Sequence, residues 1–175
     1  MTVTVREATE NDLAAVQEIY ADHVLHGLAS FEETPPDIAE IMHRFATLRG
    51  AGYPYTVALV DGRVRGYAYA GPYRPRPAYR HSVEDSVYIA TDAVGQGIGG
   101  KLLADLIDRC TALGYRQMVA IIGDSANAGS IALHARHGFI HRAIVNSVGY
   151  KHGRWVDQVI MQRALGDGDD TLPAR

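Results

Sequence analysis

The strongest restriction on the fold is a glycine-rich segment, Gly95-Gln96-Gly97-Ile98-Gly99-Gly100-Lys101, that separates two apolar patterns. Before it, Ser86-Val87-Tyr88-Ile89 is typical of a buried strand. After it, apolar residues recur at helical spacing: Leu102, Leu103, Leu106, Ile107, Cys110 and Leu113. A strand, a glycine loop and a helix in this order expose backbone N–H groups at the start of the helix, where a pyrophosphate can bind. The segment therefore predicts an anion site at the first turn of a central helix.

Taken alone, this loop is compatible with several sites. Gly95-x-Gly97-x-x-Gly100 matches the dinucleotide fingerprint, and Gly95-x4-Gly100-Lys101 nearly matches a phosphate-binding P-loop. Leu102 weakens the P-loop interpretation, because a Ser or Thr that ligates magnesium belongs there. The dinucleotide fold turns directly off its strand, whereas five residues separate Ile89 from Gly95. A purely structural turn is a further alternative, but each glycine costs about 0.5–1 kcal/mol relative to Ala, which favours close approach of a ligand.

The flanking patterns extend this unit to a mixed sheet. Upstream we expect a strand through Val3 and Val5, followed by a helix from Glu10-Asn11-Asp12 to about His26. A second helix is expected, with a buried face formed by Ile38, Ile41, Phe45 and Leu48. Two strands, Tyr55 to Val60 and Val64 to Tyr73, should then form a hairpin around Asp61-Gly62. Downstream we expect a strand over 118–122, a helix from near Ser125 or Asn127 to His137, and strands over 139–148 and 155–161. The predicted class is α/β (α+β), a mixed central β-sheet with helices on both faces. We expect residues 1–165 to form one domain and residues 166–175 to form a mobile tail.

Composition limits the class of protein. A chain of 175 residues with 47% hydrophobic and 21% charged residues can bury one core. A net charge of -3 gives no basic footprint, so nucleic acid is not an expected partner. No apolar run approaches the ~18 residues of a membrane span, so we expect no membrane partner and a cytoplasmic location. Cys110, the only cysteine, is expected to be a packed core thiol.

Five segments carry a resemblance to a known family. Val94-Gly95-Gln96-Gly97-Ile98-Gly99 is similar to the pyrophosphate loop of the GNAT superfamily of N-acetyltransferases, Arg/Gln-x-x-Gly-x-Gly/Ala, except at Val94. The others resemble phosphinothricin and methionine sulfoximine N-acetyltransferases: residues 30–36, residues 82–89, Asn127-x-x-Ser130-x-x-Leu133-His134-x-x-x-Gly138-Phe139, and residues 149–155. Val94 implies one polar contact fewer to coenzyme A, while the backbone contacts do not depend on that side chain.

The resemblance implies a cofactor site and a splayed sheet. The strand at Val87, Tyr88 and Ile89 would offer unpaired backbone groups to the pantetheine arm and the thioester carbonyl of acetyl-CoA, and a backbone donor there would stabilise the oxyanion. The resemblance also assigns coenzyme A binding to Asn127 and to the loop residues Gly95, Gln96, Gly97, Ile98, Gly99 and Gly100.

Two side chains are candidates for the proton transfers of acetylation. The amine must lose a proton before it attacks, and Glu84, expected just before the strand, is the candidate base; Asp85 is a less suitable one. The thiolate must gain a proton, and His134 occupies the helix position where the superfamily commonly has tyrosine. The alternatives are a solvated glutamate and a histidine that is merely packed. His134, His137 and His141 lack the spacing of a helical zinc motif, so no metal is expected.

Basic residues indicate an anionic acceptor. Arg74, Arg76 and Arg80 lie between the predicted hairpin and the central strand, and guanidinium groups bind carboxylate or phosphinate by paired hydrogen bonds. With Glu84 and Phe31 they form the expected acceptor site, although a solvated basic loop is the alternative. The resemblance further implies a homodimer. The leading hypothesis is acetyl transfer to a small amine by direct attack in a ternary complex; a non-catalytic acyl-CoA sensor and a nucleotide-dependent oxidoreductase or phosphotransferase are the alternatives.

Overall fold

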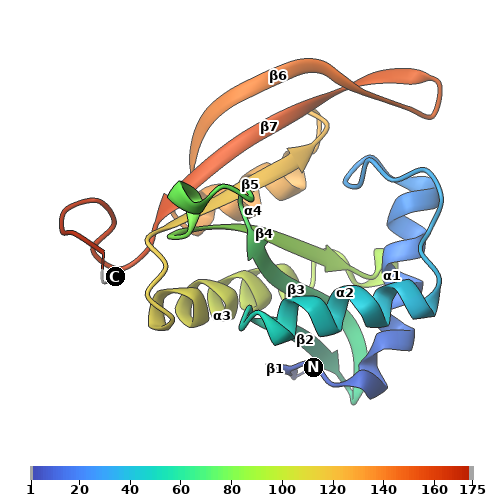
Figure 1. The fold of residues 1–175 in the computed structure, drawn as a ribbon. Coiled ribbons are helices and arrows are strands. Elements are labelled where there is room, and N and C mark those ends of the chain that lie inside the picture. The colour runs from blue at the N-terminus through green and yellow to red at the C-terminus, as the bar shows by residue number, and fades with distance from the viewer. Residues whose placement is uncertain (1, 174–175) are drawn as a thin grey trace.

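The computed structural model describes residues 2–173 as one sheet with helices on both sides (Figure 1). The strands are β1 (Val3–Glu7), β2 (Tyr55–Val60), β3 (Arg63–Pro72), β4 (Ser82–Ile89), β5 (Gln117–Gly123), β6 (Ile140–Lys151) and β7 (Arg154–Ala164). The helices are α1 (Leu13–His26), α2 (Ile38–Gly50), α3 (Ile98–Ala112) and α4 (Ala128–Arg136), with short 3-10 turns at Glu10–Asp12, Pro77–Tyr79 and Thr91–Ala93.

Local sequence signals account for most of these boundaries. Asp61 and Gly62 have φ of 49° and 77°, the left-handed pair that a tight hairpin requires between β2 and β3. Asp37 caps α2, because its side chain accepts a hydrogen bond from the Glu40 amide. The predicted buried face of α2 is wrong at Ile38, which is 45% exposed in the first turn, while Ile41 is buried.

The sheet has the order β1-β2-β3-β4-β5-β7-β6, and β4 with β5 is its parallel pair. The hairpin of β6 and β7 joins the sheet through β7, which pairs antiparallel with β5 along the whole length of β5. The long strand β6 therefore lies at the edge and arches with β7 over one end of the molecule (Figure 1).

The parallel pair separates after four residues. Ser82 to Asp85 pair with Gln117 to Ala120, but the rest of β4 and the rest of β5 do not pair with each other. The predicted splayed, mixed sheet is therefore confirmed, and it opens a fork after Asp85 and Ala120.

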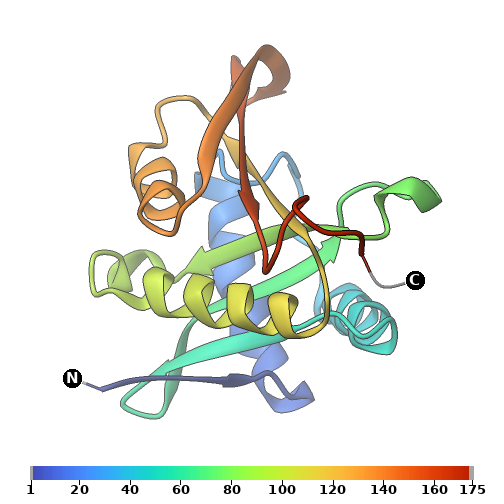
Figure 2. The same ribbon diagram turned by 90° about the vertical axis from the view of Figure 1, so that its left-hand side faces the viewer.

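Two apolar cores lie on opposite faces of the sheet. One contains residues of α1 and α2 with Tyr55, Val57 and Tyr67, and the other contains residues of α3 with Val83 and Met118. Figure 2 shows α3 in front of the sheet and α1 behind it. Cys110 is fully buried in the α3 core, as predicted, and burial raises the pKa of its thiol to about 12.

β4 begins four residues earlier than the sequence predicts. Ser82 is its first residue, so Glu84 and Asp85 lie within the strand and not before it. Side chains alternate along a strand, and Val83 and Val87 pack in the α3 core while Tyr88 packs in the α1–α2 core. Asp85 therefore points to the α3 side of the sheet, and Glu84 points to the α1–α2 side.

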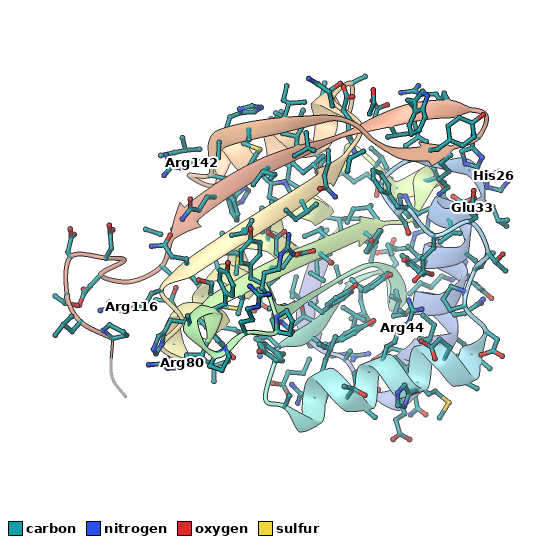
Figure 3. The ribbon with its side chains drawn as sticks, turned by 45° about the horizontal axis from the view of Figure 1, so that its top comes forward. His26, Glu33, Arg44, Arg80, Arg116 and Arg142 are labelled. Carbon is teal, nitrogen blue, oxygen red and sulfur yellow. The ribbon has the colours of Figure 1, made fainter. Side chains whose placement is uncertain are left out.

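The described part of the tail contacts the body of the molecule. Arg116 donates to the Thr171 carbonyl at 2.8 Å and lies 3.7 Å from the Asp167 carboxylate (Figure 3). The predicted mobility of residues 166–175 stays a prediction, and residues 174–175 lie outside the described residues. Between residues 2 and 173, every helix is too short or too polar to traverse a bilayer.

A buried carboxylate fixes the start of α1. Asp12, 6% exposed, accepts two hydrogen bonds from the Arg6 guanidinium, at 2.7 and 2.8 Å, and one from the Thr9 amide at 2.8 Å. The Arg6 guanidinium is the main reason why the pKa of Asp12 falls from 3.8 to about 2.

We expect Asp12→Asn to lower the free energy of unfolding by about 1–3 kcal/mol at pH 7, because an amide nitrogen would face these donors. A depressed folded-state pKa stabilises above the unfolded value, so the difference from wild type should shrink as pH falls from 3.8 towards about 2. Urea denaturation of both proteins across this range measures it. The exposed neighbour Glu10→Gln serves as the control, and an equal loss there would contradict the assignment.

Candidate functional site

The fork between β4 and β5 is a small cleft, and four of the predicted site residues line it: Val87, Tyr88, Asn127 and His134. Its walls are Asp85, Ser86, Val87 and Tyr88 from β4, Ala120 to Gly123 from β5, Asn127, Ser130 and His134 from the α4 segment, and Ala29 from the loop after α1. The cleft thus connects the α3 side of the sheet with the α1–α2 side.

The free edge of β4 presents backbone groups to this cleft. Tyr73 donates to the Ser82 carbonyl and Ala90 donates to the Arg65 carbonyl, so the even-numbered residues of β4 bond to β3. Val87 and Ile89 therefore direct their N–H and C=O groups away from β3, towards the fork. The Ile89 carbonyl accepts a hydrogen bond from His23 Nε2 at 2.8 Å. The amides of Val87 and Ile89 are both on this free edge, and Val87 is the one of the two that lines the cleft.

The glycine loop ends as the first turn of α3. Gly95 and Gly97 have φ of 84° and 77°, and a Cβ on either would meet no atom within 4 Å, so these glycines are needed for conformation. Gly99 instead allows close packing, because its Cβ would lie 3.2 Å from Leu133 of α4. Gly97 caps α3 without a side chain, which leaves the N–H groups of Ile98, Gly99 and Gly100 available to an anion.

Asn127 has a structural role that the sequence analysis did not assign. Its Oδ1 atom accepts from the Ser130 amide at 3.2 Å, which makes it the N-cap of α4, and its side chain also lines the cleft. Both the cap and the cleft wall therefore depend on this residue.

His134 is buried and paired with Asp85. Its Nε2 atom lies 2.9 Å from Asp85 Oδ2, and its Nδ1 atom lies 2.8 Å from the Ser130 carbonyl oxygen. Burial lowers the pKa of the imidazole, but the hydrogen bond and the charge of Asp85, with the Ser130 carbonyl, outweigh burial and raise the pKa above 6.5. The ring thus carries a proton more readily than a free histidine.

Glu84 lies on the opposite side of the sheet from His134. Burial raises the pKa of its carboxyl, Arg74 opposes this rise, and Asp85 adds to it. Arg74 Nη1 is 3.9 Å from Glu84 Oε2, and its guanidinium covers the Tyr73 ring at 4.5 Å. Arg76 and Arg80 are exposed, and Arg80 donates only to the Pro77 carbonyl of its own turn, so Arg74 is the predicted acceptor-site arginine that contacts Glu84.

Phe31 holds the loop after α1 against the end of the sheet. A Cβ on Gly149 would lie 2.6 Å from the Phe31 ring, and one on Gly123 would lie 3.2 Å from it. The buried Lys151 of β6 donates to the Ser30 carbonyl at 2.7 Å. The tip of the β6–β7 hairpin and this loop therefore form one wall beside the fork (Figure 1).

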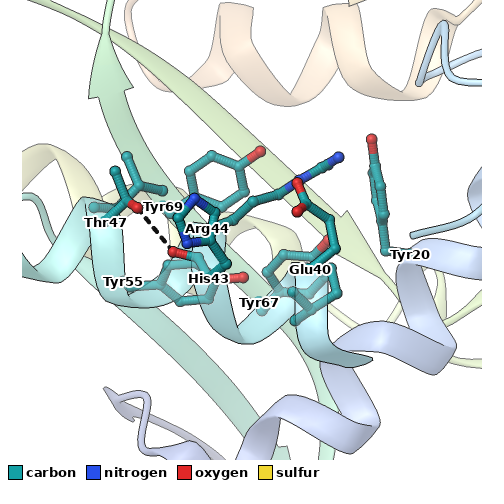
Figure 4. A pocket seen from close by; sticks show the side chains of 10 residues that line it. Tyr20, Glu40, His43, Arg44, Thr47, Tyr55, Tyr67 and Tyr69 are labelled. Carbon is teal, nitrogen blue, oxygen red and sulfur yellow. Dashed lines mark hydrogen bonds and ion pairs between the residues drawn. The ribbon is translucent and has the colours of Figure 1, made fainter. Parts of the chain in front are cut away.

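A larger cavity, about 370 Å³, lies between α2 and the sheet. Its walls include Tyr20, Tyr55, Tyr67, Tyr69 and Arg44 (Figure 4). Burial raises the pKa of each of these tyrosines, so their hydroxyls stay neutral at physiological pH. Tyr69 is paired across the strands with Ser86, which places the cavity on the same face as Glu84.

Ser130 and His23 have no role predicted from the sequence, and Asp85 is predicted only as a less suitable base, although its position carries a signal. Asp85 alternates with Val83 and Val87 on a core-facing side, and a carboxylate there requires a partner. Nothing in the local pattern identified Ser130 or His23, because their partners lie in distant segments. Among residues 2–173, no three His, Cys, Asp or Glu side chains gather closely enough to hold a metal ion.

Comparison with known proteins agrees with this geometry. The family model described as Acetyltransferase (GNAT) domain matches residues 5–160. The chain is 55% identical over 170 residues to phosphinothricin N-acetyltransferase of Alcaligenes faecalis, covering 97% of this chain and 86% of that enzyme. It is 43% identical over 166 residues to the L-methionine sulfoximine/L-methionine sulfone acetyltransferase of Pseudomonas aeruginosa, covering 94% and 96%.

The fold is also similar to that of a solved acetyltransferase structure. The GNAT superfamily phosphinothricin acetyltransferase of Sinorhizobium meliloti, crystallised in complex with AcCoA, superposes with a TM-score of 0.97 at 52% identity, covering 100% of this chain and 95% of that one. The chain belongs to the GNAT acetyltransferase family. The predicted family, fold class and enzyme class are thus confirmed.

We expect Gly149→Ala to destabilise the wall beside the fork by about 1–3 kcal/mol, because the new methyl group would overlap the Phe31 ring. Removing the ring should make that methyl group harmless. Urea denaturation of Gly149→Ala, Phe31→Ala and the double variant measures the coupling between the two positions. Strictly additive losses would show that the ring and Gly149 do not interact.

Proposed function

We propose that this acetyltransferase moves the acetyl group of acetyl-CoA to the primary amine of a small anionic amino-acid analogue, of the phosphinothricin, methionine sulfoximine or methionine sulfone type. The observation that supports the proposal most directly is the free edge of β4, which lines the cleft beside Asn127 and His134 and directs the Val87 amide into the fork. The amine attacks directly while both substrates are bound.

The α3 side of the fork is the coenzyme side of the proposed site. Acetyl-CoA supplies an activated thioester. The amides of residues 98–100 face its diphosphate without competition from a capping side chain, and the left-handed Gly95 and Gly97 bring the backbone close. The Val87 amide is the donor aimed at charge that develops on the thioester oxygen. Asn127 and the β4 residues Tyr88 and Ile89 complete the wall.

The α1–α2 side of the fork receives the acceptor. Glu84 takes a proton from the ammonium, and its raised pKa makes it a better base at neutral pH than an ordinary glutamate. Arg74 is the anion-binding residue next to it, with Arg76 and Arg80 on the same loop and Phe31 on the facing wall. His134, on the coenzyme side, returns a proton to the sulfur.

Two other functions remain as comparisons for experiment. A nucleotide-dependent enzyme would use the same helix start, and an acyl-CoA sensor would keep the cofactor site without the chemistry. The raised pKa of Glu84 supports an enzyme over a sensor, because perturbed carboxyl groups are more frequent at catalytic sites.

The effect of ligands on the melting temperature distinguishes an acetyltransferase from a nucleotide-dependent enzyme. A ligand at one hundred times its dissociation constant adds about 2.7 kcal/mol to stability, so acetyl-CoA should raise the melting temperature by several degrees. NAD and ATP at the same concentration should not. Stabilisation by NAD or ATP alone would overturn the proposal.

Substitution of Glu84, the proposed base, distinguishes an acetyltransferase from a non-catalytic acyl-CoA sensor. We expect Glu84→Gln to lower kcat by about 10²–10⁴-fold with acetyl-CoA binding retained, measured as thiol release over a panel of amines. Because deprotonated Glu84 is the active form, the wild-type rate should rise with pH through a pKa above 4.5, and this rise should be absent in the variant. Wild-type enzyme that releases no thiol with any acceptor would favour the sensor.

We further propose that the chain forms a homodimer through the β6–β7 hairpin and acts in the cytoplasm. Exposed apolar side chains gather there: Ile140, Ile144, Val145, Val148, Tyr150 and Trp155. A lone buried cysteine without a disulfide suits a reducing compartment.

Sedimentation velocity tests the dimer. We expect a dimer for wild type and a monomer for the double variant Val148→Asp, Trp155→Asp, because each charge would enter an apolar interface. Leu113→Asp, at an exposed apolar position after α3, is the matched control and should stay dimeric. A monomeric wild type would contradict the proposal.

A further inference from the structure

An aspartate on an otherwise apolar strand face lies at the fork. The Asp85 side chain is 1% exposed and the His134 side chain 5% exposed, and their atoms Oδ2 and Nε2 are 2.9 Å apart. The second Asp85 oxygen, Oδ1, is also buried and has no hydrogen-bond partner among residues 2–173. Asp85 is the last residue of β4 that pairs with β5, so the carboxylate sits where the cleft begins.

The shortest polar contact of each His134 nitrogen is with an atom that can only accept a hydrogen bond. Nε2 faces the carboxylate, and Nδ1 lies 2.8 Å from the Ser130 carbonyl oxygen. Two acceptors are satisfied only when both nitrogens carry a proton, so the geometry selects the imidazolium form. The direction of the His134 pKa agrees with this.

Few other ionisable groups face the pair. Cys110 on α3 is near enough to Asp85 for the carboxylate to contribute to its raised pKa, so this thiol stays neutral. His137, the residue that follows α4, directs Nδ1 to the Leu133 carbonyl. The cleft residues of β5, which are Ala120 to Gly123, do not ionise, and Glu84 lies on the other side of the sheet.

We propose that Asp85 is a positioning residue that holds His134 doubly protonated and fixes the nitrogen from which the proton leaves. The proposal rests on the acetyl transfer proposed above. Loss of the Nδ1 proton leaves Nε2–H on the carboxylate, whereas loss of the Nε2 proton would set a bare nitrogen against a negative charge. The proton therefore leaves from Nδ1.

Ser130 provides the exit for that proton. Its hydroxyl Oγ lies 3.4 Å from Nδ1 and lines the cleft. When the carbon–sulfur bond of the thioester breaks, the electron pair goes to sulfur. The Ser130 hydroxyl gives its proton to the thiolate and takes the Nδ1 proton of His134. His134 ends neutral and regains a proton from solvent before the next turnover.

A purely structural ion pair is the competing explanation. Buried ion pairs often stabilise a fold no better than apolar residues of the same size, so stability alone does not explain a carboxylate between Val83 and Val87. The two explanations differ in one observable quantity, the pH dependence of turnover.

The test compares wild type with Asp85→Asn, which keeps the shape and removes the charge; Asp105→Asn on the surface of α3 is the matched control. Histidine side-chain NMR titration of the ligand-free proteins is the first measurement. We expect wild-type His134 to titrate above 6.5, the variant to titrate at lower pH, and the control to match wild type. If Asp85→Asn does not fold, the titration of His134 in the wild type decides its charge state, and a pKa of His134 that is not above 6.5 overturns the proposal. An unshifted His134 in folded Asp85→Asn overturns the proposal.

Turnover is the second measurement. Because protonated His134 is the active form, kcat falls at high pH, and in Asp85→Asn this fall should begin at lower pH with about a tenfold or greater loss at pH 8. Ser130→Ala should lower kcat while the His134 titration stays unchanged. A kcat profile that does not move in Asp85→Asn makes the pair structural and overturns the proposal. Absence of thiol release from wild type would instead contradict the proposed function itself.

Discussion

The separation of β4 from β5 is the constraint on which the site depends. A parallel pair that ends after Asp85 and Ala120 leaves half of a central strand without hydrogen bonds on one side. Such an edge is costly inside a protein unless another group uses it. His23 takes one of the free carbonyls, at Ile89, and the Val87 amide remains for a ligand. The proposed function gives this edge a use, because acetyl-CoA would bind along it.

The fork also connects two faces that a continuous sheet would isolate. Neighbouring side chains of one strand point to opposite sides, so Glu84 faces α1 and α2 while Asp85 faces α3 and α4. In an unbroken sheet, groups so placed could not act on the same molecule. Here Glu84, next to Arg74, and Asp85, paired with His134, lie on opposite faces of the sheet beside the point where the two strands separate.

Periodicity and turn chemistry predicted nearly every element, because those signals are local. The hairpin at Asp61-Gly62 and the glycine-capped start of α3 are examples. The start of β4 was misjudged because Glu84 and Asp85 are not typical strand residues, and the strand contains them only because β3 and β5 pair with it. The anion site at the glycine loop and the basic residues of the acceptor site were predicted from the sequence pattern, whereas His134, Asn127 and the cofactor role of β4 came from the resemblance. Their contacts, such as Asp85 with His134 across 49 positions of sequence, are tertiary and leave no local pattern.

The contact between Lys151 and Ser30 joins segments separated by 121 positions. The loop that carries Phe31 is synthesised early, yet the glycine and the lysine that hold it arrive with β6. Until β7 is made, β5 also lacks its antiparallel partner and is an exposed edge strand. A ribosome-bound chain that ends before this hairpin therefore has an open sheet and an unanchored loop. Assembly of the wall beside the fork is consequently a late event in folding, and shortened chains are at risk of aggregation.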